Sequence, residues 1–207
     1  MNYNLLFENI ESEINSLLDI GCYIGNFSGI FTDEFNLKNT NILCIDINPA
    51  YKELIESRGF RFRAVGLSSE RKNIPVYYPK NPDSLFDPRN SGVSYCRENT
   101  IFFSDCVVSS QEVFPLDEIS NSETFDFIKI DVQGAEYDVI DGGKETLKKS
   151  KYVLVETSCG DYNIGSKNEE KTIELLSSLG FKEKKVLEEI YIEEVLQQRD
   201  ILFERMC

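Results

Sequence analysis

Two glycines and an aspartate near the start of the chain have the spacing of a nucleoside site. Gly21 and Gly25 lie in LDIGCYIGN at 18–26, where an apolar run gives way to a helical pattern. Glycine lets a backbone turn sharply and approach a ligand closely because it has no Cβ. Asp46 ends the next apolar run, where a carboxylate can accept hydrogen bonds from both hydroxyls of a ribose. The spacing D-x-G-x-x-x-G is neither a dinucleotide fingerprint nor a P-loop. It therefore predicts a nucleoside with an amino-acid tail rather than a pyrophosphate.

A second group of chemical residues follows a later apolar run, in KIDVQGAE at 129–136. Asp131 stands at the end of this run and Gly134 permits a tight turn after it. Glu136 lies in the first turn of the next helix, where the helix dipole favours a negative charge. We expect Asp131 to face the same crevice as the glycine turn, because the carboxyl ends of parallel strands meet at one edge of a sheet.

Short apolar runs alternate with amphipathic stretches, which predicts βαβ units and an α/β fold. The expected fold is a doubly wound, mainly parallel seven-stranded sheet, with 74–78 as an added hairpin arm. Strands are expected at 16–20, 41–47, 61–65, 125–131, 151–156, 182–187 and 200–205, the last two as a closing pair at one edge. Helices are expected at 4–15, 26–34, 49–58, 135–147 with a break at the glycines 142–143, and 168–179.

The chain of 207 residues suits a single domain spanning 1–207. Residues 79–111 contain Pro79, Pro82, Pro88 and Gly92 with little periodicity. Irregular segments of this length are uncommon unless they serve a function. We interpret 79–111 as a lid or acceptor-binding segment.

Composition argues against several classes of partner. A formal net charge of −14 repels phosphate backbones and anionic lipids, so neither nucleic acid nor a membrane is expected as a partner. No signal peptide or membrane-spanning run is evident, and the six cysteines form no CxxC pair. The chain has no histidine, which rules out a Cys/His zinc site. These features predict a cytoplasmic protein with free thiols, and they leave its oligomeric state open.

Six segments, in order, resemble the FkbM-type family of S-adenosylmethionine-dependent methyltransferases. They are LDIGCYIGNFS at 18–28, CIDINPAY at 44–51, AVGLSSE at 64–70, FPLDEI at 114–119, FDFIKIDVQGAEYDVIDGG at 125–143 and VLVE at 153–156. The resemblance implies a class I methyltransferase fold, which is Rossmann-like, with S-adenosyl-L-methionine as cofactor. Characterised members of the family methylate hydroxyl groups, often on sugars.

The resemblance also assigns residues to the cofactor site. The methionine end would contact Asp19, Gly21, Gly25 and Asn26. Asp46 would hold the ribose, with Ile47 beside it. The residues near the adenine would be Gly66, Leu67 and Ser68. Asp131 would border both the cofactor and the acceptor. Two positions depart from the family pattern: Cys22-Tyr23 replaces the usual Ala-Asn, and Gln133 replaces the usual Glu.

Methyl transfer to a hydroxyl requires a group that removes its proton. Without histidine, that base is a carboxylate, Lys, Tyr or Cys. Asp131 is the first candidate because of its strand-end position, Glu156 at the end of the neighbouring strand is the second, and Glu136 is the third. Each is either the base or a hydrogen-bond anchor. The three could also converge on a hard cation, but a salt bridge or water network explains such a cluster better, so no metal is predicted.

The sequence thus favours an O-methyltransferase acting on a hydroxyl of a sugar, glycan or related small molecule. A methyltransferase with another class of acceptor is an alternative. A non-catalytic nucleoside-binding module that acts through a partner is another, supported by Gln133 and Tyr23. Nicotinamide-dependent reduction is disfavoured by the missing G-x-G-x-x-G.

Overall fold

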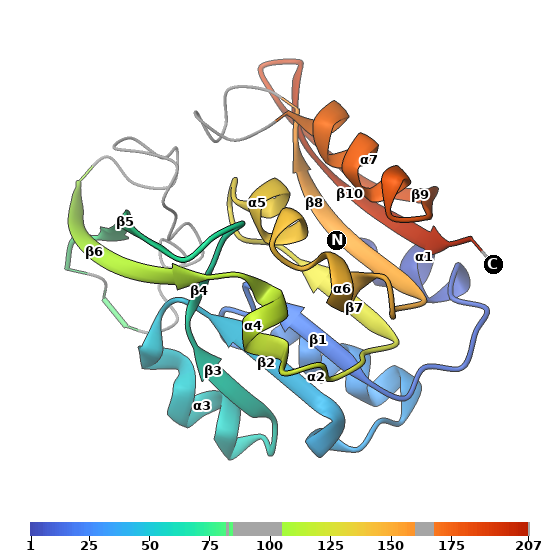
Figure 1. Cartoon of the computed structure of the whole chain (residues 1–207), viewed down its shortest axis with the longest axis horizontal. Helices are drawn as coiled ribbons and strands as arrows, with labels where there is room; N and C mark the ends of the chain where they lie inside the picture. The colour runs from blue at the N-terminus through green and yellow to red at the C-terminus, as the bar shows by residue number, and fades with distance from the viewer. Residues whose placement is uncertain (82, 85–104, 160–167, 207) are drawn as a thin grey trace.

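The computed structural model describes residues 1–81, 83–84, 105–159 and 168–206. Its main sheet has seven strands in the order β3-β2-β1-β7-β8-β10-β9 (Figure 1). The strands are β1 (Leu17–Ile20), β2 (Ile42–Asp46), β3 (Arg61–Ala64), β7 (Phe127–Ile130), β8 (Tyr152–Ser158), β9 (Phe181–Ile192) and β10 (Val195–Arg205). All pairs are parallel except β10 with β8 and β10 with β9. The predicted doubly wound, mainly parallel seven-stranded sheet is confirmed.

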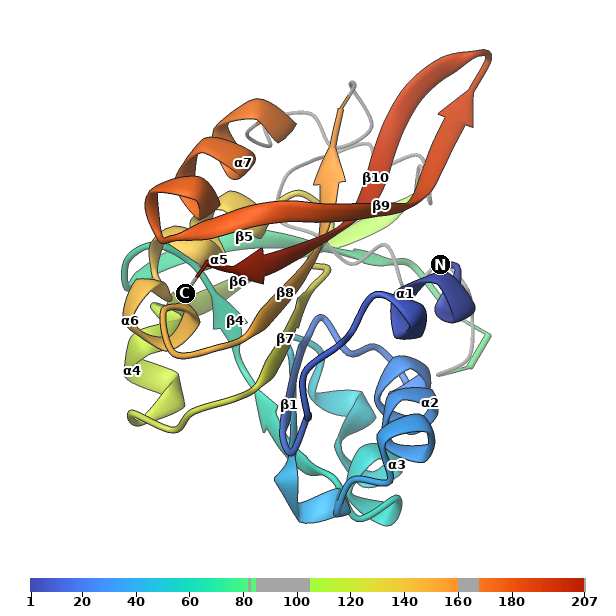
Figure 2. The same cartoon turned by 90° about the vertical axis from the view of Figure 1, so that its right-hand side faces the viewer.

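Both faces of the sheet are covered, which explains why its central strands are almost entirely apolar. One hydrophobic layer joins Leu18 and Ile20 to residues of α4, α5, α6 and α7. The other joins Leu17 to residues of α1, α2 and α3, and Figure 2 shows these two helix groups on opposite sides of the sheet. The helices are α1 (Tyr3–Glu8), α2 (Asn26–Phe35), α3 (Lys52–Ser57), α4 (Leu116–Ser120), α5 (Glu136–Asp141), α6 (Lys144–Leu147) and α7 (Glu169–Ser178), with 3₁₀ turns η1 (Asn39–Asn41) and η2 (Pro49–Tyr51).

A smaller sheet lies beside the main one, in the order β4-β6-β5. Its strands are β4 (Gly66–Leu67), β5 (Lys72–Pro79) and β6 (Cys106–Phe114), and β5 pairs antiparallel with β6. The predicted arm at 74–78 is confirmed, but the treatment of 79–111 as wholly irregular is wrong from Cys106 onward. The sequence conceals β6 because Val107 and Val108 are both exposed, so apolar and polar residues do not alternate. The remainder of the expected lid, 82 and 85–104, lies outside the described residues.

The first helix is shorter than its apolar spacing predicts. It ends at Glu8 rather than near residue 15, and Asn9 caps it by donating its side-chain N–H to Leu5 O at 2.8 Å. Ile14 is nevertheless buried, because the extended segment after the helix returns to the same hydrophobic layer. The apolar periodicity thus identified the buried residues correctly, but it predicted a helix where the backbone after Glu8 is extended.

The strand order places the functional loops. The order in which strands are added to the sheet reverses at β1. The chain first places β2 and β3 on one side of β1 and then places β7, β8, β10 and β9 on the other. Open α/β sheets bind ligands at the carboxyl ends of the strands flanking such a point. The loops after β1, β2 and β7 therefore converge at that edge.

Candidate functional site

The loop after β1 is held directly against the loop after β7. Gly21 has φ +75°, and a Cβ at this position would lie 1.6 Å from the carbonyl oxygen of Asp131. Its N–H donates to Ile45 O of β2 at 2.8 Å. Any side chain at this position would separate the two loops. Gly21 thus joins three strand ends, and a residue with a Cβ cannot replace it without a backbone shift.

Asp46 holds the loops after β1 and β2 together while facing the cavity between them. Its Oδ2 accepts the N–H of Tyr23 and its Oδ1 accepts the N–H of Asn48, both at 2.9 Å. Each oxygen keeps a lone pair, so the carboxylate can still accept two hydroxyl groups. Burial raises the pKa of Asp46 to about 7. A ligand that donates hydrogen bonds to this carboxylate would favour its ionised form and lower that pKa.

A buried lysine, which the sequence did not single out, organises the carboxylates after β7. Lys129 is 5% exposed, and its Nζ lies 2.9 Å from Asp131 Oδ2 and 3.7 Å from Asp19 Oδ1. The ring of Phe27 lies 5.5 Å from the same nitrogen. Burial opposes the charge of Lys129, but the two carboxylates outweigh it and raise its pKa. Although burial alone would raise the pKa of Asp131, the Lys129 charge and hydrogen bonds lower it, so Asp131 is ionised at neutral pH.

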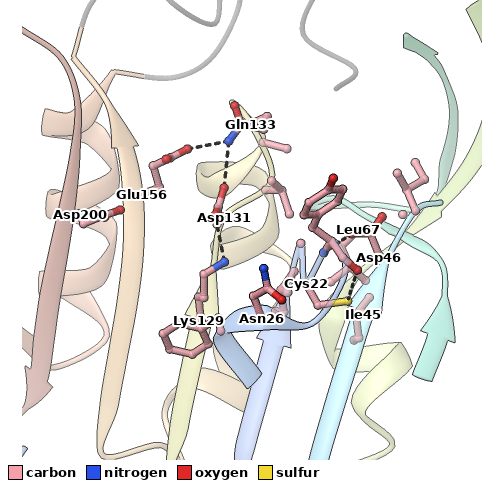
Figure 3. A pocket seen from close by; sticks show the side chains of 18 of the residues that line it. Cys22, Asn26, Ile45, Asp46, Leu67, Lys129, Asp131, Gln133, Glu156 and Asp200 are labelled. Carbon is pink, nitrogen blue, oxygen red and sulfur yellow. Dashed lines mark hydrogen bonds and ion pairs between the residues drawn. The ribbon is translucent and has the colours of Figure 1, made fainter. Parts of the chain in front are cut away.

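Glu156 of β8 and Asp131 form a bridged pair (Figure 3). Gln133 Nε2 donates to Asp131 Oδ1 at 3.0 Å and to Glu156 Oε2 at 2.8 Å, and Gln198 Nε2 donates to the same Glu156 oxygen at 2.9 Å. Burial and the Asp131 charge raise the pKa of Glu156 well above its usual range. The pair thus combines an ionised Asp131 with a Glu156 carboxyl that holds its proton more tightly than usual, a common arrangement of adjacent acids in active sites.

Glu136 instead supports the loop after β7 from behind. It is 4% exposed and accepts the N–H groups of Val132 and Gly134, each at 3.0 Å. Burial raises its pKa to about 7. It does not line the cavity described below, and its contacts are those of an anchor, which the sequence left open as the alternative to a base.

One cavity of about 320 Å³ lies over these loops, a volume within the range of small-molecule sites. Eight of the predicted site residues line it: Gly21, Asn26, Asp46, Ile47, Gly66, Leu67, Asp131 and Glu156. One end is apolar and is walled by Ile45, Ile47, Val65, Leu67, Val76 and Val113. The other end is polar and contains Lys129, Asp131, Gln133, Glu156, Glu188 and Asp200. The predicted convergence of Gly21, Asp46 and Asp131 on a shared cavity is confirmed.

Three other predicted cofactor residues do not line this cavity. Asp19 is fully buried and accepts a 2.6 Å hydrogen bond from Ser28 Oγ of α2. Gly25 has φ +75°, and a Cβ there would lie 2.5 Å from Ile55 Cδ1, so it allows α2 and α3 to pack. Ser68 is 1% exposed, and its N–H donates to Phe114 O of β6 at 2.9 Å. The structure thus places all three as supports of the wall.

Sequence reasoning missed several lining residues. Lys129 was visible in KIDVQG but received no role. Asp200 and Glu188 lie on the last two strands, and Tyr3 precedes the first motif. Only the pairing of β10 between β8 and β9 brings Asp200 to the site, and no local pattern signals that pairing.

Within the described ranges, no three or more His, Cys, Asp or Glu residues form a group suited to a metal ion. No helix of that same part of the chain is long and apolar enough to cross a membrane.

A sequence model of the FkbM methyltransferase domain matches residues 19–183. The chain belongs to the FkbM methyltransferase family. Membership confirms the resemblance seen in the sequence, and with it S-adenosylmethionine as the expected cofactor.

This FkbM-family chain is 29% identical over 157 residues to the 2-O-methyltransferase NoeI of Sinorhizobium fredii. The match covers 69% of this chain and 63% of that protein, so the chain spans less than two thirds of its relative's length.

Solved structures confirm the fold. A methyltransferase FkbM from Methylobacillus flagellatus KT matches with a TM-score of 0.54 at 12% identity, covering 94% of this chain and 44% of that one. The magnesium protoporphyrin IX methyltransferase of Synechocystis PCC 6803, solved with bound SAH, matches with a TM-score of 0.56 at 8% identity, covering 99% and 79%. At such identities the likeness concerns the fold alone.

Proposed function

We propose that the protein transfers a methyl group from S-adenosylmethionine to a hydroxyl of a sugar, glycan or related small molecule. The observation that carries this proposal is the single cavity shared by Gly21, Asp46 and Asp131, which follow three different strands. Family membership supports methyl transfer. Hydroxyl as the acceptor group is supported by the 2-O-methyltransferase relative and by the polar, carboxylate-rich end of the cavity.

The cavity residues fit this cofactor. The apolar end between Ile47 and Leu67 suits an adenine ring, and Asp46 has two free lone pairs for the ribose hydroxyls. Gly21 and Asn26 border the part that would hold the methionine end. In this arrangement Asp19, Gly25 and Ser68 act on the cofactor indirectly, through the loops they support.

Bound in this cavity, the cofactor supplies a methyl group on a positively charged sulfur. The protein holds the acceptor oxygen in line with that group and receives its proton. Asp131 is the proposed base: Lys129 keeps it ionised, and each of its oxygens retains a lone pair beyond the hydrogen bonds from Lys129 and Gln133. The hydroxyl proton of the acceptor would pass to Asp131, which Gln133 links to Glu156 and holds in position.

Calorimetry with S-adenosylhomocysteine tests the cofactor site. We expect micromolar binding by the wild type and a loss of about tenfold to a hundredfold in Asp46→Asn, because hydrogen bonds to a charged group contribute about 1.5–3 kcal/mol. Asp33→Asn, an exposed change of the same type on α2, serves as the matched control and should bind like the wild type. Folded wild-type protein that binds no S-adenosylhomocysteine would refute the proposal.

Two outcomes would favour the competing functions. Cofactor binding without methyl transfer to any compound in a broad glycan and metabolite screen would favour a non-catalytic module. The Tyr23 and Gln133 departures support that alternative, since both residues line the cavity. Thermal stabilisation by NAD but not by S-adenosylhomocysteine would favour a reductase.

For Asp131→Asn we expect a fall in turnover of about 100-fold to 10,000-fold, because the proposed base is lost.

A further inference from the structure

A row of acidic side chains crosses three strands at the polar end of the cavity. In the sheet register Asp200 of β10 pairs with Glu156 of β8 on one side and with Glu188 of β9 on the other. All three residues line the cavity, and Asp131 borders it from the end of β7. Directly opposed like charges destabilise paired strands. Stability of the fold therefore does not account for this row.

Asp200 differs from its neighbours because it has no partner within the described part of the chain. Asp131 pairs with Lys129, and Glu156 accepts two amide groups. Glu188 contacts the amino group of Met1. Asp200 is only 9% exposed, yet none of the described residues donates a hydrogen bond to its carboxylate or forms an ion pair with it. Figure 3 shows it beside Glu156 at the wall of the cavity.

The surroundings of Asp200 favour a positively charged ligand group over a neutral one. Burial and the nearby Asp131 charge raise the pKa of Asp200 to about 6, so it is ionised at neutral pH. Two cations lie on the described wall, and each already has partners: Lys129 is shared between Asp19 and Asp131, and the amino group of Met1 contacts Glu188. A buried carboxylate among other carboxylates gains most from a cation, because an unpaired buried charge is costly.

Aromatic rings lie on the same side of the cavity. Tyr3 lines the wall, and its ring centroid is 6.2 Å from that of Phe27, which also lines it. Burial raises the pKa of Tyr3, and the charges of Asp19, Asp200 and Asp131 add to the effect while Lys129 opposes it. Aromatic faces attract ammonium groups. A carboxylate beside aromatic rings is therefore well suited to a protonated amine.

We propose that Asp200 binds a protonated amine of the acceptor, and that the acceptor is an amino sugar or a similar hydroxyl compound bearing an ammonium group. This inference rests on the proposed function, which it narrows to one class of acceptor. Phosphorylated and carboxylated sugars are excluded, because each would bring a negative charge against the row Asp131, Glu156, Asp200 and Glu188.

The test uses protein saturated with S-adenosylhomocysteine and three probes: glucosamine, glucose and glucose 6-phosphate. Binding is measured by calorimetry near neutral pH for wild type, Asp200→Asn and the control Glu183→Gln. Glu183 lies on β9, is exposed, and loses the same charge. We expect the wild type and the control to bind glucosamine at least about tenfold more tightly than glucose, and glucose 6-phosphate most weakly. Asp200→Asn should lose the preference for glucosamine, since an ionic hydrogen bond is removed.

A wild type without preference for glucosamine, or without affinity for any of the three sugars, would overturn the proposal. So would an unchanged preference in Asp200→Asn. Weaker S-adenosylhomocysteine binding by Asp200→Asn would overturn it as well, since Asp200 would then bind the cofactor. If that variant does not fold, the wild type still decides: glucosamine affinity should fall as pH drops through about 6, and a flat profile refutes the role. Failure of S-adenosylhomocysteine binding to wild type would instead refute the proposed function.

Discussion

Replacing Asp200 with asparagine should stabilise the ligand-free protein at neutral and alkaline pH. Burial and the Asp131 charge raise the pKa of this carboxyl from 3.8 to about 6. Each tenfold change in proton affinity corresponds to about 1.4 kcal/mol, so the ionised form costs the folded state about 3 kcal/mol. Asparagine has nearly the same shape and removes this cost.

The direction of the pH dependence follows from the same shift. Because the folded protein holds this proton more tightly than the unfolded chain, the wild type loses stability as pH rises from about 4 to about 6. Asp200→Asn lacks this loss. The two proteins should therefore be equally stable below about pH 4, and the variant should be more stable by about 3 kcal/mol above about pH 7.

Urea unfolding of both proteins across this pH range measures the difference in their unfolding free energies. The contributions of the other titrating groups are the same in both proteins and cancel. Thermal unfolding should show a midpoint about 6–12 °C higher for the variant at neutral pH. Glu183→Gln, which removes an exposed charge from β9, should change stability by less than about 0.5 kcal/mol. If Asp200→Asn is less stable than wild type at neutral pH, or if the difference does not vary with pH, then the carboxylate has a partner and the reasoning fails.

Three further changes test the architecture of the site. Gly21→Ala should abolish S-adenosylhomocysteine binding in calorimetry, because its Cβ would lie 1.6 Å from Asp131 O and force the two loops apart. Glu136→Ala should lower the urea-unfolding free energy by about 1–3 kcal/mol, since the N–H groups of Val132 and Gly134 lose their acceptor. Lys129→Met should cost about 3–5 kcal/mol by the same assay, because it leaves Asp19 and Asp131 without their cation. It should also move the acid limb of the turnover profile to higher pH, as the pKa of Asp131 rises.

Much of the main sheet was predictable because its central strands are short apolar runs bounded by turn residues. LLDI, ILCID and FIKI are buried on both faces, and such runs are typical of parallel strands under two helix layers. The cofactor end was predictable for a related reason. The positive φ of Gly21 and the position of Asp46 at the end of a strand both depend on neighbouring residues in the sequence. A short stretch of sequence is therefore enough to predict them.

The acceptor end was not predictable in the same way. Asp200 reaches the cavity through the antiparallel insertion of β10 between β8 and β9. Its register with Glu156 depends on long-range pairing, and bulges interrupt the pairing of β10 with β9. In the sequence it is one acid among 36 acidic residues. β6 was not predicted for a comparable reason. It is a strand because it pairs with β5, and it has no continuous buried face that an alternating apolar pattern would reveal.

Two residues with strained backbone and one buried charge lie at the cavity, which is itself an argument for function there. Tyr23 and Gln133 line it with φ of 48° and 55°, a left-handed conformation that costs L-residues about 1–2 kcal/mol. Asp200 adds a buried charge that no described residue neutralises. Elsewhere in the sheet, apolar strands pack in the way their sequence predicts. Strained backbone and unpaired charge persist where surrounding structure holds them for a ligand. The cofactor would engage the loops that contain Tyr23 and Gln133, and a cationic acceptor would neutralise Asp200.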